Sequence, residues 1–218
     1  MPAARAIDHL VLAVTDLAHA RTRMGLLGFT VAPDARHPFG TENACVFFQD
    51  GSYLEPLAIG SEDGSRETAR AGNVFTARDR AFRFRQGQEG LEAVVFRTDD
   101  AAADHAAYVS AGFSAGKILE FSRPFAMPDG QVSEAAFRLA FASDLRSPDF
   151  YAFTIRRVRI DRHSPCMRTA RWALRGSRYA NRIQRISPIS LGLLRTVILP
   201  FRQAMASACR SEPHACPL

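Results

Sequence analysis

The sequence predicts an α+β fold made of two tandem βαβββ modules, and a repeated pattern predicts it. Residues 7–14 form an alternating, mostly apolar run that is typical of a strand, and a similar run recurs at 90–97. Each run leads into an alanine-rich, helix-like stretch that ends in Gly-Phe, at 28–29 and again at 112–113. A strand, a helix and further strands in the same order twice indicate a duplicated unit.

The duplication can be aligned on the aspartates that follow the two strand-like runs. Setting Asp16 on Asp99 places His9 on Glu92. His9 is the one histidine in its otherwise apolar run, so this position of the first strand is where chemistry is expected.

The first module is predicted to cover residues 5–60. An aspartate can cap a helix, a glycine can end one, and Asp-Gly is a strong hairpin signal. Its expected elements are a strand over 7–14, a helix from Asp16 to Gly28, a strand over 29–32, a polar loop, and two strands over 43–48 and 52–59 joined through Asp50-Gly51.

The second module is predicted to cover residues 90–155, after a connector at 61–89 that begins as a polar, irregular stretch. The connector carries a predicted helix around 74–84. The elements expected beyond it are a strand over 91–97, a helix over 99–111, and strands near 114–121, 132–142 and 150–155.

Charge divides the chain unevenly. The net charge is +6, but residues 156–218 hold 13 arginines against two acids, whereas residues 1–155 hold 15 basic and 20 acidic residues. The body is therefore mildly acidic, and 156–218 forms a basic tail.

Neither the four cysteines nor the first residues of the sequence indicate a secreted protein. The cysteines show no Cys-x-x-Cys spacing, so neither a zinc finger nor a disulfide framework is indicated, and Cys45 is expected to be a small buried residue. The start has no apolar signal-peptide core, and the apolar run at 191–201 is too short to span a bilayer. A cytoplasmic location is predicted.

Several motifs together resemble the vicinal oxygen chelate superfamily, in particular its glyoxalase-like domain branch, over about residues 5–150. The motifs are Ile7-Asp8-His9-Leu10-Val11-Leu12-Ala13-Val14-Thr15-Asp16-Leu17, His37-Pro38-Phe39-Gly40-Thr41-Glu42-Asn43, Tyr53-Leu54-Glu55, Ser122-Arg123-Pro124-Phe125, Pro128-Asp129-Gly130 and Glu134-Ala135-Ala136-Phe137-Arg138-Leu139-Ala140-Phe141. The resemblance implies that the two modules form a curved sheet around a cavity.

The resemblance also implies a metal site, with His9 and Glu55 as ligands of a divalent metal ion. An imidazole and a carboxylate facing one cavity suit a first-row metal that acts as a Lewis acid. Glu92 would be a third ligand or the catalytic base, whereas the counterpart of Glu55 falls near Ala152, which cannot ligate. The alternative is that His9 is a hydrogen-bonded core or pocket histidine.

Further residues are predicted to bind substrate. His37 lies in a loop before a strand, and Tyr53 lies two residues from Glu55 on the same strand face. The full predicted set is His37, Thr41, Asn43, Tyr53, Arg123 and Arg138. The loop residues have a structural alternative, a turn that orients the hairpin, and the two arginines have another, solvation or ion pairing.

The tail has two interpretations. Relatives of this branch would continue with a histidine-rich stretch and a His-x-Asn-Gly-Ala motif. If residues 153–156 and 166–171 are written with GC-rich codons and read in one alternative frame, they give His-His-Pro and His-Ala-Asn-Gly-Ala. The tail would then be an out-of-frame translation that starts near residue 150. Alternatively, arginines three or four apart from Arg168 to Arg185 form a basic helix that binds nucleic acid or an anionic membrane.

Two functions are expected from these features. The first is a metal-dependent lyase, isomerase or dioxygenase that acts on a small oxygenated molecule. The alternative is a metal-free protein that binds and sequesters a small molecule, as bleomycin-resistance members do. A small-molecule ligand and a homodimer are the expected partners, and nucleic acid or membrane is expected only if the basic tail is genuine.

Overall fold

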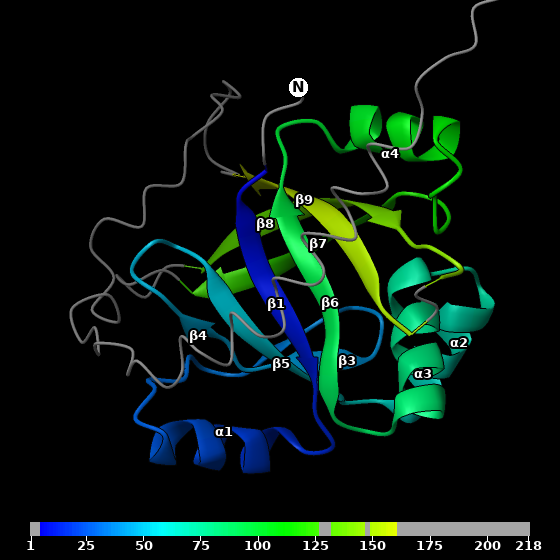
Figure 1. Cartoon of the computed structure of the whole chain (residues 1–218). Helices are drawn as coiled ribbons and strands as arrows, with labels where there is room; N and C mark the ends of the chain where they lie inside the picture. The colour runs from blue at the N-terminus through cyan, green and yellow to red at the C-terminus, as the bar shows by residue number, and fades with distance from the viewer. Residues whose placement is uncertain (1–4, 127–131, 147–148, 161–218) are drawn as a thin grey trace, which may run out of the picture. The chain divides into compact units, whose positions relative to one another are not determined.

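The computed structural model describes residues 5–126, 132–146 and 149–160, and the predicted basic tail beyond residue 160 lies outside them. This part of the chain contains both strands and helices (Figure 1). In order, they are β1 (Ile7–Ala13), α1 (Leu17–Leu26), β2 (Ala35–Arg36), β3 (Thr41–Asn43), β4 (Val46–Phe47), β5 (Tyr53–Ile59), α2 (Glu62–Arg70), α3 (Val74–Gln86), β6 (Gly90–Arg97), α4 (Ala101–Ser110), β7 (Leu119–Ala126), β8 (Val132–Ala142) and β9 (Tyr151–Ile160).

All the strands belong to one curved sheet, which confirms the predicted α+β fold. Its order is β2-β3-β5-β1-β6-β9-β8-β7, with β4 paired to β5. The first strand of each module lies parallel to a later strand of the same module, β1 to β5 and β6 to β9. The modules meet where β1 and β6 pair antiparallel at the centre of the sheet (Figure 1).

The β1–β6 pairing has a local twofold symmetry. Leu10 pairs with Val94, and the pair His9–Val95 is matched by the pair Val11–Ala93, so each residue of β1 corresponds to the β6 residue 84 positions later. The helix-capping residues Asp16 and Asp100 are 84 apart as well.

This offset corrects the alignment made from the sequence by one residue. His9 corresponds to Ala93, and Glu92 corresponds to Asp8. Val11 pairs with Glu55 and its counterpart Val95 pairs with Phe153, so Phe153, and not Ala152, occupies the position of Glu55. The reason is that the alignment used Asp99, whereas the residue that caps α4 is the adjacent Asp100, 84 positions after Asp16. A bulge at each end of the pairing places one extra residue in each strand, Asp8 in β1 and Glu92 in β6, and leaves this offset unchanged.

The helix boundaries follow from local chemistry. The carboxylate of Asp16 accepts a hydrogen bond from the His19 amide at 2.6 Å, and that of Asp100 accepts from the amides of Ala102 and Ala103 at 3.0 Å. Glycines in the left-handed region, Gly28 and Gly112, follow α1 and α4. Asp16 and the two glycines are signals on which the duplication was predicted, whereas the prediction used Asp99 in place of Asp100.

Several local predictions were wrong. The strand expected over 43–48 is divided into β3 and β4, and the strand expected near 114–121 begins only at Leu119. Residues 29–32 form no strand; instead the Arg21 guanidinium donates to the carbonyls of Val31 and Ala32 at 3.4 and 2.8 Å. The polar connector contains an additional helix, α2, whose first turn is capped by Ser61 through a 3.1 Å bond from the Gly64 amide. Ser61 before Glu62 and Asp63 is an ordinary helix-start signal, whereas the loss of the strand depends on hydrogen bonds from Arg21, which lies ten or more residues earlier.

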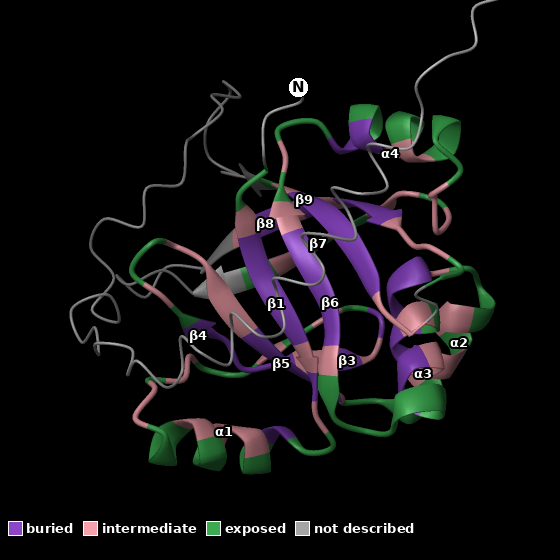
Figure 2. Cartoon of the chain, viewed as in Figure 1, coloured by how far each residue is buried: buried purple, intermediate pink, exposed green. Residues whose placement is uncertain are grey.

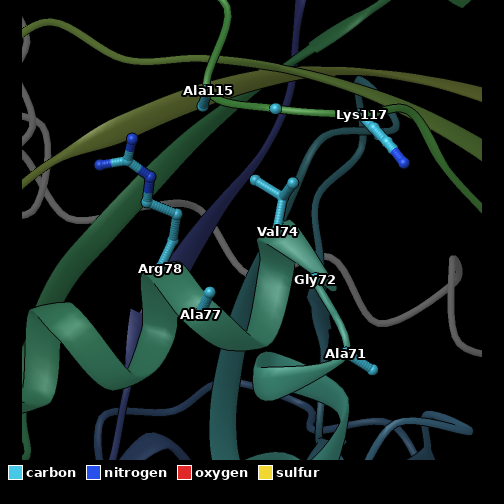
Figure 3. A pocket seen from close by; sticks show the side chains of 8 residues that line it. Ala71, Gly72, Val74, Ala77, Arg78, Ala115 and Lys117 are labelled. Carbon is cyan, nitrogen blue, oxygen red and sulfur yellow. The ribbon is translucent and has the colours of Figure 1, made fainter.

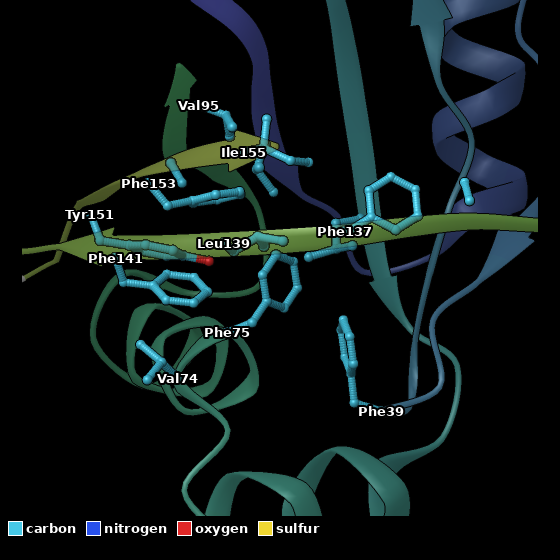
Figure 4. Close-up of a cluster of buried hydrophobic side chains, with 14 residues drawn as sticks. Phe39, Val74, Phe75, Val95, Phe137, Leu139, Phe141, Tyr151, Phe153 and Ile155 are labelled. Atoms are coloured by element: carbon cyan, nitrogen blue, oxygen red, sulfur yellow. The ribbon is translucent and has the colours of Figure 1, made fainter. Parts of the chain in front are cut away.

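The main core fills the concave side of the sheet and is unusually aromatic (Figures 2 and 4). Its buried members come from the centre of the sheet, from α3 and from the loop before β3: Val11, Phe39, Leu57, Val74, Phe75, Ala93, Val95, Ala135, Phe137, Leu139, Phe141, Tyr151, Phe153 and Ile155. A second cluster lies under α1, where Leu17 packs on Ala44 and Ala58. Helix α3 thus covers the concave face, and its ring Phe75 reaches into the core.

Two further predictions concern single features. Cys45 is a free, buried thiol, as expected, and burial raises its pKa well above the usual range. Within the described ranges no helix is long and apolar enough to cross a membrane.

Candidate functional site

The centre of the candidate site is a buried chain of three side chains, Asp8, His9 and Glu55. The Nδ1 atom of His9 lies 2.6 Å from Asp8 Oδ1, and its Nε2 atom lies 3.0 Å from Glu55 Oε2. All three residues are at most 5% exposed. Both ring nitrogens of His9 therefore face carboxylate oxygens inside the protein.

The strands explain how these residues meet. Parallel pairing of β1 and β5 sets His9 beside Tyr53 and Val11 beside Glu55. Asp8 is the extra residue of the bulge between the pairs Ile7–Phe96 and His9–Val95. A bulge redirects a side chain that regular alternation would send to the opposite face, so Asp8 and His9 can point to the same side.

Glu55 is held as a carboxylate. Burial acts to raise its pKa, but the hydrogen bond from His9 and the nearby imidazoles outweigh this effect and lower the pKa to about 2. The Asn43 amide donates a second hydrogen bond, to Glu55 Oε1. The two oxygens are thus bound from two different strands, β1 and β3.

Asp8 is held ionised by cations on its other side. Arg157 donates to both of its oxygens, at 2.8 Å between Nη1 and Oδ2, and Arg97 lies 3.4 Å away. Burial acts to raise the pKa of Asp8, but His9 and Arg157 bring it below its ordinary value. Arg157 also donates to the Tyr53 hydroxyl at 2.8 Å.

Tyr53 forms a wall of the site. Its ring stacks on the His9 ring with 4.3 Å between centroids and 14° between planes. Burial raises the pKa of its hydroxyl well above 10, so the group stays protonated. Phe153 approaches the other side of His9 edge-on at 5.9 Å.

His37 is a second imidazole at the same site. Its Nδ1 atom lies 2.9 Å from the Thr41 hydroxyl, and its Nε2 atom lies 3.9 Å from Glu55 Oε1. Its ring stacks on Phe39 at 5.0 Å. Burial, with help from the charge of Arg123, lowers the pKa of His37 to about 4, so its imidazole is neutral at pH 7.

Most of the residues predicted from the sequence come together. His9, Glu55, His37, Thr41, Asn43 and Tyr53 are linked by the contacts above. Arg123 lies near enough for its charge to act on His37, and its guanidinium stands 5.8 Å over the Phe137 ring. Two predicted residues stand apart from this cluster: Arg138, which binds Glu120 at 2.8 Å on the surface, and Glu92, which accepts from the Tyr151 hydroxyl at 2.8 Å.

The sequence analysis missed Asp8 and Arg157. Asp8 immediately precedes His9, and strict strand alternation assigns neighbours to opposite faces. Arg157 lies 149 positions from Asp8 in the chain, within the stretch interpreted as tail. The remaining signal for Asp8 was an aspartate inside an otherwise apolar strand.

The donor set suits part of a metal site. Among the described residues, no group of three or more His, Cys, Asp and Glu side chains is arranged to hold a metal ion. His9 and Glu55 nevertheless offer an imidazole nitrogen and a carboxylate oxygen 3.0 Å apart, and Asp8 fixes the ring from behind. A carboxylate bound to the far nitrogen of a histidine is the usual outer partner of a metal-binding imidazole. In the second module the equivalent positions hold Ala93 and Phe153.

A surface pocket lies elsewhere in the molecule (Figure 3). Its volume is about 350 Å³. It is lined by Ala71, Gly72, Val74, Ala77, Arg78, Ala115, Gly116 and Lys117. None of the predicted site residues lines it.

Comparisons with known proteins identify a family. The family model described as a glyoxalase-like domain matches residues 7–191, which continues past the end of the motif-level resemblance. No curated protein matches the chain.

Three solved structures are similar at low identity. A single-residue variant of the Streptomyces coelicolor methylmalonyl-CoA epimerase in complex with 2-nitronate-propionyl-CoA is 23% identical, with a TM-score of 0.44 over 70% of this chain and 97% of the other. A methylmalonyl-CoA epimerase in complex with methylmalonyl-CoA and NH4+ is 23% identical, with a TM-score of 0.44 over 70% and 94%. A hypothetical protein from Staphylococcus aureus is 12% identical, with a TM-score of 0.49 over 68% and 58%.

The family match covers most of the chain and agrees with the motifs of the first module. The chain therefore belongs to the glyoxalase-like domain family.

Proposed function

We propose that this protein is a divalent-metal-dependent enzyme that acts on a small oxygenated molecule, with its reactive centre in the first module. The observation that carries the proposal is the buried Asp8–His9–Glu55 chain. One carboxylate fixes the imidazole through Nδ1, and Nε2 is directed at a second carboxylate that is ionised at neutral pH.

His9 Nε2 and Glu55 would hold the metal. Both are preorganised without it, because Asp8 fixes the ring orientation and Asn43 fixes the carboxylate. When bound, a divalent ion would polarise a substrate oxygen as a Lewis acid. The proton that bridges His9 and Glu55 would have to leave, so metal binding should release protons and weaken at low pH.

The other residues of the site would bind the substrate and accept its proton. His37 is neutral at pH 7, and its Nε2 atom faces Glu55, so it can accept a hydrogen bond or a proton from a substrate hydroxyl. The Asn43 amide and the Tyr53 hydroxyl can orient oxygen atoms. Arg123 at the edge can attract an anionic substrate. Glu92 lies outside these contacts, so we assign the role of base to His37.

Metal titration of the full chain tests the proposal. After treatment with chelator, Mn²⁺, Co²⁺, Ni²⁺ and Zn²⁺ are each titrated by calorimetry into the wild type, His9→Ala and Glu55→Gln. The control is His19→Ala, because His19 also stands beside a carboxylate, that of Asp16 at 3.7 Å, but on the surface. We expect one equivalent of metal in the wild type and the control, and none in the two site variants. No stoichiometric binding in the wild type would refute the metal centre.

A second function is favoured by the apolar side of the site. The positions equivalent to His9 and Glu55 are Ala93 and Phe153, and Phe39, Phe75 and Phe121 surround His37. Such walls suit a metal-free protein that binds an aromatic or otherwise apolar small molecule. Ligand-observed NMR with a panel of small hydroxy acids and phenols, with and without metal, separates the two functions. The same samples, measured by light scattering, test the predicted homodimer.

A further inference from the structure

A second buried polar cluster joins the connector helix α3 to the second module. It consists of Glu92 on β6, Asp79 and Arg83 on α3, and Tyr151 on β9. Glu92 and Asp79 are 0% exposed, Tyr151 is 2% exposed and Arg83 is 6% exposed. Residues this polar are rarely buried together unless every charge is compensated.

The cluster occupies the symmetry-related position of the Asp8 centre. Glu92 is the extra residue of the bulge between the pairs Val11–Ala93 and Leu12–Leu91, just as Asp8 is the extra residue of the other bulge. In the first module, cations and an imidazole surround this carboxylate. In the second, its neighbours are the Tyr151 hydroxyl and another carboxyl group.

The two carboxyl groups have fewer hydrogen-bond donors than they have oxygen atoms that need one. Tyr151 donates to Glu92 Oε1, and Arg83 Nε donates to Asp79 Oδ1 at 2.8 Å. The remaining oxygens, Glu92 Oε2 and Asp79 Oδ2, are buried and have no donor from any described group. The other Arg83 nitrogens donate to the main-chain carbonyls of Val14, Leu57 and Gln88 at 3.0–3.1 Å.

The charges around the two carboxyl groups are not balanced either if both groups are ionised. One guanidinium faces two carboxyl groups, and the other cation that acts on Asp79, Arg80, is bound to Glu62 at 2.7 Å. The two carboxyl groups are hydrogen-bond neighbours, and one of them can donate only if it carries a proton. Two adjacent ionised carboxylates would repel each other at low dielectric.

We infer that Glu92 and Asp79 share one proton at neutral pH, and that this proton fastens helix α3 to strand β6. With Arg83 balancing the remaining negative charge, the cluster is neutral overall. Burial raises the pKa of Glu92 and of Asp79, which supports the assignment. The inference does not depend on the metal centre, which lies in the other module.

The shared proton holds α3 where it closes the core. Asp79 lies one turn beyond Val74 and Phe75, which pack against Phe141 and Phe153 on the sheet (Figure 4). If the pair lost its proton, two ionised carboxylates would face one guanidinium, and their mutual repulsion would separate α3 from β6. The charged and titratable groups that face the pair are Arg80 and Arg83 from α3 and Tyr151 from β9.

This predicts a specific pH dependence of folding. An acid whose pKa is raised in the folded state keeps a proton that the unfolded chain loses above about pH 4.3, so the unfolded state binds fewer protons. The folding equilibrium constant should then fall by up to about tenfold per pH unit above that value, until the pair itself ionises.

The experiment compares the wild type with Glu92→Gln, a neutral isostere of the protonated acid. Its amide can donate to Asp79 and accept from Tyr151. Denaturant unfolding from pH 5 to 9 should show the fall in the wild type and a flatter profile in the variant. The matched control is Asp104→Asn, because Asp104 is a buried carboxylate whose two oxygens are both bound to Arg5. It should keep the wild-type slope.

Infrared spectroscopy detects the proton directly, even if the variant fails to fold. The wild type at pH 7 should show the carbonyl stretch of a protonated carboxyl group that shifts in D₂O, and Asp104→Asn should retain it. Glu92→Gln, if folded, should lack it. Absence of this band in the wild type, or a Glu92→Gln profile parallel to that of the wild type, would overturn the inference.

Discussion

Replacing Arg83 by Met is the change whose effect can be worked out most fully from the structure. Arg83 is 6% exposed and joins α3 to three other parts of the chain: the end of β1 at Val14, β5 at Leu57, and the loop at Gln88. It also forms an ion pair with Asp79, four residues earlier, at 2.8 Å. Met keeps much of the length and apolar volume of the side chain but donates no hydrogen bond.

The expected loss in the free energy of unfolding is large. Removing one partner of a buried ion pair costs about 3–5 kcal/mol, because the other charge is left uncompensated. Three main-chain carbonyls lose a donor as well, at about 1–3 kcal/mol for each that stays buried and unsatisfied. These terms are not additive, and Asp79 can take up a proton, so we expect a total of about 4 kcal/mol at pH 7.

Guanidinium unfolding at pH 7 measures this loss. Arg80→Met is the control on the same helix, because Arg80 forms a more exposed pair with Glu62 and should cost below about 1 kcal/mol. The double variant Arg83→Met/Asp79→Asn should recover part of the loss by removing the orphaned charge. A loss below about 1 kcal/mol for Arg83→Met would show that the buried network contributes little to stability.

Three further outcomes are expected. Gly40 and Gly72 have φ of +92° and +91°, but a Cβ atom on Gly40 would lie 2.5 Å from the Ser65 amide nitrogen, whereas one on Gly72 meets nothing within 4 Å. Gly72→Ala should therefore lose only the roughly 1 kcal/mol of backbone strain. Thermal unfolding should show a much larger loss of stability for Gly40→Ala. Phe153→Ala should lose about 3–5 kcal/mol in denaturant unfolding, because the ring is 1% exposed, and a smaller loss would mean that the core refills the cavity. In the metal-free protein, NMR titration should show His37 ionising near pH 4. Because the unfolded chain takes up this proton near pH 6.5, His37 lowers the stability of the fold as pH falls from 6.5 to 4. Titration of His37 above pH 6 would contradict its burial.

The sequence contains enough local information to predict the duplication. The aspartates before α1 and α4 and the glycines after them act within one turn of the chain, so their effect is visible in the residues themselves. His9 and Glu55 were paired through the resemblance to a known family, and the parallel pairing of β1 and β5 brings their strands together.

What the sequence could not predict depends on contacts between distant segments. A bulge is a property of two paired strands, so neither strand alone reveals that Asp8 turns toward His9 or that Glu92 is the counterpart of Asp8. Arg157 becomes part of the site only because β9 runs beside β6, which the position of the residue in the chain does not disclose. The same holds for Arg21, whose hydrogen bonds replace the expected strand at 29–32.

The twofold pairing of β1 and β6 has an evolutionary consequence. If the two modules were separate, identical copies of one chain, every substitution would appear on both sides of the axis, and the two bulges would have to carry the same carboxylate environment. Joining them in one polypeptide releases that constraint. The symmetry-related positions now hold Asp8, ionised among arginines, and Glu92, beside a tyrosine and a second acid. The two halves are therefore free to carry different polar environments at equivalent positions of the same sheet.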